Sequence, residues 1–65
     1  MYQLKTDALG LKDGHTVYGE TKEEVIAKMF QYLEMRHAAY IGEQTIQRLA
    51  EIDAVIKLHI EEIPG

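Results

Sequence analysis

The chain has 65 residues, of which 46% are hydrophobic and 28% charged, and 7 Lys and Arg against 11 Asp and Glu give a net charge of −4. It contains no Cys, Ser, Asn or Trp, so disulfide scaffolds, cysteine zinc sites and Ser or Cys nucleophiles are excluded. No apolar run approaches the roughly 20 residues of a membrane-spanning helix, and no clustered basic face of the kind that binds nucleic acid is present. We therefore expect a soluble, cytoplasmic protein that binds neither membrane nor nucleic acid.

The first residues predict a β-hairpin over 2–19. Apolar and polar residues alternate from the start of the chain, which is typical of a strand with one buried face. Asp13-Gly14 suits a two-residue type I′ turn, in which both positions take a positive φ. Such a turn would place Leu11 opposite Thr16 in the paired strands.

A capping box predicts the start of the first helix. The Thr21 hydroxyl and the Glu24 carboxylate, three residues apart, can each accept a hydrogen bond from the other's backbone N–H. The apolar spacing that follows predicts a helix over about 22–40. Gly42 then fits the position just after a helix, where a left-handed conformation is common.

A second helix is predicted over about 44–62, ending before Pro64. An uninterrupted helix through Gly42 is the alternative, at a cost of about 1 kcal/mol relative to Ala. The apolar stripe of this second helix covers about 120° of its circumference and consists of Ile46, Leu49, Ile52, Ile56, Ile60 and Ile63.

These elements predict an α+β fold in one domain of residues 1–65, with the hairpin packed on an antiparallel two-helix hairpin. A chain of about 60 residues buries only about 60% of its unfolded surface, so such cores often need a metal or a partner subunit. Six of the seven isoleucines lie between Ile41 and Ile63. We therefore expect the stripe of the second helix to form a homo-oligomer, in the simplest case a two-fold dimer.

The segment 6–37 resembles a family of small predicted metal-binding proteins of unknown function. The residues that carry the resemblance are Ala8-Leu9-Gly10, the run from Gly19 to Val25 that reads Gly-Glu-Thr-Lys-Glu-Glu-Val, and His37. The resemblance implies a short hairpin, a helix and a metal site to which His37 contributes. The family's cysteine positions correspond to Thr6 and Asp13 in this chain.

One constellation of residues suggests a metal site independently. Glu34 and His37 form Glu-x-x-His, a spacing that places both side chains on one flank of a helix and that di-iron and di-manganese helical bundles use. In an antiparallel helical hairpin, Glu51 and Asp53 would lie within reach. Iron, manganese or zinc are the metals that we consider, and the simplest expectation is no cofactor.

Two charged residues interrupt the apolar stripes. Asp53 lies within the stripe of the second helix, and Arg36 lies within that of the first. A carboxylate among apolar side chains must be paired, hydrogen-bonded or exposed to water. We expect Arg36 and Asp53 to form a structural ion pair, within the chain or between subunits.

The sequence favours a small non-enzymatic, homo-oligomeric module for binding or regulation, although its residue types do not exclude acid–base catalysis. One alternative is a metal-binding protein that uses Glu34, His37 and the helix carboxylates. Another is a small acidic inhibitor of a protein partner, of the kind that mobile elements encode.

Overall fold

A computed structural model describes residues 1–64 and has an α+β architecture. Three short strands form one antiparallel sheet, and the chain also has a single-turn 3-10 helix and three α-helices. The elements in chain order are β1 Tyr2–Lys5, η1 Thr6–Leu9, β2 Thr16–Gly19, α1 Lys22–Arg36, α2 Ala38–Ile41, α3 Ile46–His59 and β3 Glu61–Glu62.

The sheet has the order β2-β1-β3, so the first strand of the chain lies in its centre. Leu4 pairs with Val17 in the β1–β2 ladder, and both side chains are buried. Lys5, on the other face of β1, is exposed. The predicted alternation of buried and exposed residues therefore holds for Leu4 and Lys5, whereas Tyr2 and Gln3 are both partly buried.

The connection between β1 and β2 differs from the predicted tight turn. Residues 6–15 form η1 and a loop, so the pairing of Leu11 with Thr16 is wrong; Thr16 instead pairs with Lys5. A type I′ turn needs a positive φ at both positions, but Gly14 has φ 68° and Asp13 has no positive φ. The side chain of Asp13 is bound by groups distant in the sequence, which determine this loop conformation.

The first helix begins at the predicted position but ends earlier than expected. Thr21 accepts a hydrogen bond from the Glu24 backbone N–H at 3.1 Å, which confirms the helix cap. The predicted helix over 22–40 is interrupted at His37, whose φ of −137° is not helical. Gly42 follows α2 with a positive φ of 68°, although its ψ of −129° is not that of the left-handed helix.

The end of the chain was predicted wrongly. Helix α3 stops at His59, and Ile60 has an extended conformation. Glu61 and Glu62 then pair with Gln3 and Tyr2 on the second edge of β1. This edge would otherwise leave backbone groups without partners, and pairing with it replaces the predicted last helical turn over 60–62.

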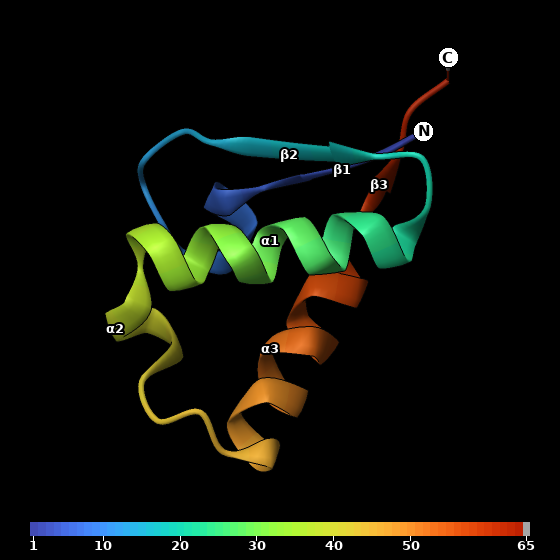
Figure 1. Cartoon of the computed structure of the whole chain (residues 1–65). Coiled ribbons are helices and arrows are strands. Elements are labelled where there is room, and N and C mark those ends of the chain that lie inside the picture. Colours follow the sequence, from blue (N-terminus) through green and yellow to red (C-terminus); the bar gives the residue numbers. More distant parts are fainter. Residues whose placement is uncertain (65) are drawn as a thin grey trace.

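The arrangement of the helices also differs from the predicted helical hairpin. Figure 1 shows α1 lying along the sheet. Helix α3 runs at a steep angle to α1 rather than antiparallel beside α1. Side chains from the sheet, η1 and all three α-helices form one core: Leu4, Leu9, Val17, Val25, Met29, Leu33, Ile41, Ile52 and Ile56. None of the described helices is both long and apolar enough to cross a membrane.

Candidate functional site

A cluster of hydrogen bonds around Asp13 joins the loop before β2 to the end of α1. Asp13 Oδ1 accepts a bond from Thr6 Oγ1 at 2.5 Å. Asp13 Oδ2 lies 2.8 Å from His37 Nε2 and also accepts a bond from the hydroxyl of Tyr32. We refer to Thr6, Asp13, His15, Tyr32 and His37 as the Asp13 cluster.

The backbone on either side of the cluster positions its members. Thr6 follows β1 and is fully buried, and its hydroxyl oxygen accepts a hydrogen bond from the His15 backbone N–H at 3.2 Å. The His15 ring then stacks on Tyr32, with ring centroids 4.0 Å apart and planes inclined by 6°. The loop therefore packs against α1 by ring stacking as well as by hydrogen bonds.

These contacts shift the pKa of two members. Hydrogen bonds from Thr6, Tyr32 and His37 favour the charged carboxylate and hold the pKa of Asp13 far below its usual range. The bond to this carboxylate favours the neutral phenol and raises the pKa of Tyr32. Because an ionised carboxylate can only accept hydrogen bonds, Nε2 of His37 is the donor in this contact with Asp13.

The Asp13 cluster borders an open hollow of about 370 Å³, which Asp13, His15, Tyr32, Arg36 and His37 line. The oxygens of Asp13 already accept three side-chain hydrogen bonds from within the cluster. Catalysis usually requires a site from which water is excluded, and this hollow is open. The arrangement therefore fixes the loop to the helix, and it offers a substrate no unengaged carboxylate.

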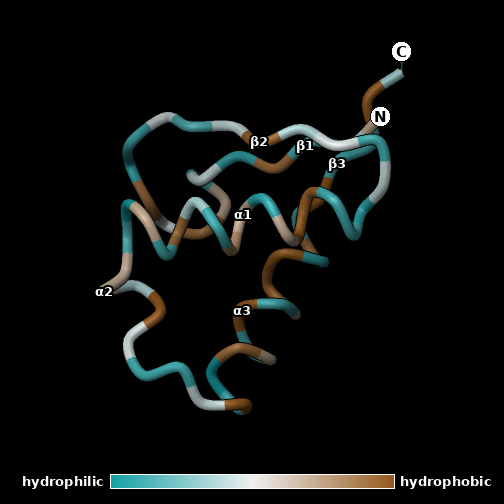
Figure 2. The backbone as a smooth tube through the Cα atoms, viewed as in Figure 1, coloured by the Kyte–Doolittle hydropathy of each residue, from teal (hydrophilic) through white to brown (hydrophobic). Residues whose placement is uncertain are grey.

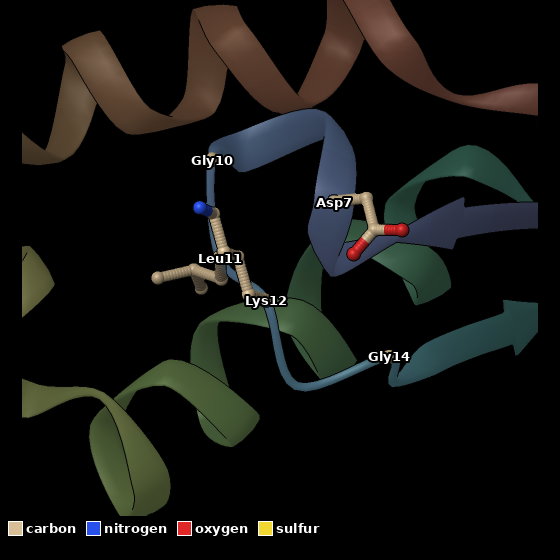
Figure 3. Close-up of a pocket in the computed structure, with 5 residues that line it drawn as sticks. All are labelled: Asp7, Gly10, Leu11, Lys12 and Gly14. Carbon is tan, nitrogen blue, oxygen red and sulfur yellow. The ribbon is translucent and has the colours of Figure 1, made fainter.

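A second open hollow, of about 500 Å³, lies on the loop itself and is lined by Asp7, Gly10, Leu11, Lys12 and Gly14. Figure 3 shows the Asp7 carboxylate pointing away from the Lys12 side chain. Ligand sites usually combine an apolar pocket with convergent polar groups. This hollow has no such convergence.

The structure does not bring the predicted metal ligands together. His37 contacts Asp13, and Glu34 is exposed. The Glu51 carboxylate lies 3.5 Å from the Arg48 guanidinium. The Asp53 carboxylate lies 2.9 Å from Nζ of Lys57. Within residues 1–64, no group of three or more His, Asp or Glu side chains is placed to hold a metal ion. The donor set that the Glu-x-x-His spacing implied therefore does not fit a metal in this structure, whereas the three positions named by the family resemblance, Thr6, Asp13 and His37, do meet in the Asp13 cluster.

Within the chain, Arg36 and Asp53 do not form the predicted ion pair. Asp53 pairs with Lys57, one turn along the same helix. Arg36 lies instead beside the hollow at the Asp13 cluster. The steep crossing of α1 and α3 separates the two residues that an antiparallel hairpin would have placed close together.

The six residues of the predicted interface divide into inner and outer positions. Ile52 and Ile56 are 1% and 0% exposed and belong to the core of the chain. Leu49, Ile60 and Ile63 are partly buried. Only Ile46 is open to solvent, with 89% of its surface exposed. The centre of the stripe therefore stabilises the fold of the single chain.

A second apolar row on α3 is exposed, and the isoleucine pattern of the sequence does not single it out. Ile46, Ala50, Ala54 and Leu58 follow one another at intervals of four residues, and all four are exposed. Leu58 is 80% exposed. We call these four residues the outer row. Figure 2 shows hydrophobic residues along α3 from its first turn to its last. The constant spacing was visible in the sequence, but the alanines made the row less conspicuous than the isoleucines.

Comparison with known proteins adds no relative: no family model, curated protein or solved structure matches the chain.

Proposed function

We propose that the chain is a non-enzymatic interaction module that works as a homo-oligomer and uses the outer row of α3 as its contact surface. One observation carries the proposal. Ile46 and Leu58, at the two ends of the helix, are 89% and 80% exposed, and the residues of the row between them are alanines. Contiguous exposed apolar patches mark sites of interaction when they are large enough, and this row is a small patch.

The two sides of α3 support this proposal by their different roles. Ile52 and Ile56 are fully buried against the rest of the chain. The outer row is continuous, because side chains four residues apart lie on one side of a helix. It projects opposite Ile52 and Ile56, because Ala54 and Leu58 each lie two residues from Ile56, about 200° around the helix. Removing apolar surface from water contributes about 25 cal/mol per Å². A partner on the outer row would supply this stabilisation, which the single chain lacks.

The Asp13 cluster supports a binding rather than a catalytic role. Its carboxylate accepts hydrogen bonds from Thr6, Tyr32 and His37. A general base must reach the proton that it removes, and this carboxylate is already engaged within the chain. The apolar surface of α3 is therefore the stronger candidate for the functional surface.

The small size of the outer row predicts a weak assembly. Stable specific interfaces bury about 800 Å² on each partner, which exceeds what four side chains of one helix face supply. Each copy also has a net charge of −4, so two copies repel each other at long range. Salt screens this repulsion. We expect association that depends on protein concentration and strengthens as the salt concentration rises.

Light scattering and sedimentation over a range of protein and salt concentrations test the proposal. The wild type should pass from monomer to oligomer as its concentration rises, and Ile46→Lys combined with Leu58→Lys should abolish this transition. Met35→Lys is a matched control, because Met35 is an exposed apolar residue on α1, with 73% of its surface accessible. Both variants should keep the wild-type circular dichroism spectrum and melting temperature at low concentration.

Two results would contradict the proposal. The first is a wild type that stays monomeric at every concentration and salt level. The second is a double variant of α3 that associates as strongly as the wild type. Association that weakens with salt would indicate ionic contacts instead and would favour an acidic surface as the functional one.

A further inference from the structure

The Asp13 cluster joins side chains that lie far apart in the sequence. Thr6 follows β1, Asp13 lies in the loop before β2, and His37 ends α1. Thr6 Oγ1 and His37 Nε2 lie 2.5 and 2.8 Å from the two oxygens of the Asp13 carboxylate, and the Tyr32 hydroxyl also donates to that carboxylate. Side chains from three segments therefore converge on one point, as the ligands of a structural metal ion do in a small domain.

The chemical groups at this point differ from those of a metal site. Zinc is bound by thiolates, imidazoles and carboxylates, almost always four of them in a structural site, and thiols and carboxyl groups bind in their deprotonated forms. Thr6 and Tyr32 offer hydroxyl groups instead, and both donate their protons to Asp13. Asp13 and His37 are of a ligating type, but within residues 1–64 no third such side chain is placed to complete a site with them.

We propose that the Asp13 cluster is a metal-free counterpart of a structural metal site, in which hydrogen bonds to one carboxylate hold the loop to α1. The family resemblance supports this proposal, because its two cysteine positions correspond to Thr6 and Asp13 and its histidine to His37. These three positions are distant in the sequence, yet their side chains contact one another in the structure. The proposal concerns how this chain holds its fold and is independent of the proposed function, which rests on α3.

The position of Thr6 explains how hydrogen bonds can take this role. Its side chain is fully buried, and a hydrogen bond that is shielded from water is electrostatically stronger than an exposed one. The Thr6 hydroxyl oxygen also accepts a bond from the His15 backbone N–H. Residues 11–15 form no helix or strand, so the cluster fixes a segment that regular backbone pairing does not reach. Small domains without disulfides often use a metal ion for such a purpose.

Zinc titration of the wild type and of one triple variant tests the proposal. The wild type should melt at the same temperature in a chelator and in excess zinc. Thr6→Cys combined with Asp13→Cys and Tyr32→His supplies, with His37, the two thiolates and two imidazoles of a common zinc site. This variant loses the hydrogen bonds of the cluster and should be unstable alone, but it should bind one equivalent of zinc. Its melting temperature should then rise by about 10 °C or more when free zinc exceeds the dissociation constant about a hundredfold.

A matched control carries the same three kinds of substitution at other positions. Thr16→Cys, Tyr40→His and Asp53→Cys lie on three different elements, β2, α2 and α3. The new thiols and imidazole are therefore not gathered around one point. The control should bind zinc weakly and should show no comparable rise in melting temperature.

A second variant keeps the test decisive if the triple variant does not fold. Thr6→Cys with Asp13→Cys retains Tyr32, and cobalt should give this double variant the absorption of a cobalt–thiolate site, which the control should lack. Cysteine variants that bind zinc and cobalt no better than the control would overturn the proposal. So would a wild type that holds one equivalent of metal and loses stability when a chelator removes it. Neither result bears on self-association through α3, which light scattering measures separately.

Discussion

The Asp13 cluster and the outer row of α3 are both at the surface, but they differ in how far their groups are satisfied within the chain. In the cluster, the carboxylate accepts hydrogen bonds from three side chains. In the outer row, Ile46 and Leu58 remain mostly exposed. The cluster resembles a site because it collects titratable groups, yet these groups serve one another. The comparison separates a polar cluster whose groups are engaged within the chain from an apolar row whose large side chains remain exposed to solvent.

The largest expected effect is the difference in stability between substitutions on the two opposite sides of α3. Ile56→Ala should lower the free energy of unfolding by about 2–5 kcal/mol, because it removes buried apolar contacts and leaves a cavity. Leu58→Ala, two residues further on and exposed, should change it by no more than about 0.5 kcal/mol in the monomer. Urea unfolding at low protein concentration measures both changes. Equal effects of the two variants would remove the distinction between an inner and an outer side of the helix.

A smaller effect is expected within the Asp13 cluster. Thr6→Val keeps the shape of a buried side chain but removes the hydroxyl that serves Asp13 and His15. A hydrogen bond within a folded protein contributes about 0.5–1.5 kcal/mol. Because Asp13 and His15 are exposed and water can replace the lost partner, we expect Thr6→Val to destabilise the fold by about 1 kcal/mol in urea unfolding. Thr16→Val, at a partly buried position of β2, is the matched control and should stay within about 0.5 kcal/mol of the wild type. Destabilisation no larger than that of the control would show that the cluster does not hold the loop.

The dependence of stability on pH gives the smallest and most specific effect. The pKa of Asp13 is lowered in the folded chain, while its unfolded value is about 3.9. The contribution of Asp13 to the free energy of unfolding is therefore fully present above that value and is lost as the pH falls toward the folded pKa. The pKa of Tyr32 is raised from about 10, so its contribution is present below that value and is lost as the pH rises through the folded pKa.

Unfolding free energies measured across the pH range should show both limbs in the wild type. Asp13→Asn should flatten the acidic limb relative to the wild type, and Tyr32→Phe should flatten the alkaline limb. Variants whose pH profiles run parallel to that of the wild type would show that these two groups are not coupled to folding.

The features that could be predicted from the sequence are those that neighbouring residues determine. The cap at Thr21 depends on a residue three positions away, and the burial of Leu4 follows from simple alternation along β1. The break at His37 could not be predicted, because its ring binds Asp13, which lies 24 residues earlier. In the same way, the change from helix to strand at Ile60 depends on the free edge of β1 at the other end of the chain. The donor set expected for a metal failed for a related reason, since it assumed that the two long helices lie antiparallel.

The pairing of β3 with β1 makes residues at the two ends of the described chain neighbours in one sheet. The backbone N–H of Ile63 donates to the carbonyl of Met1 at 2.8 Å, and Figure 1 shows β1 and β3 side by side. A chain truncated before Glu61 would leave the central strand with an open edge of the kind that recruits other strands. Such a truncated chain should be prone to intermolecular pairing.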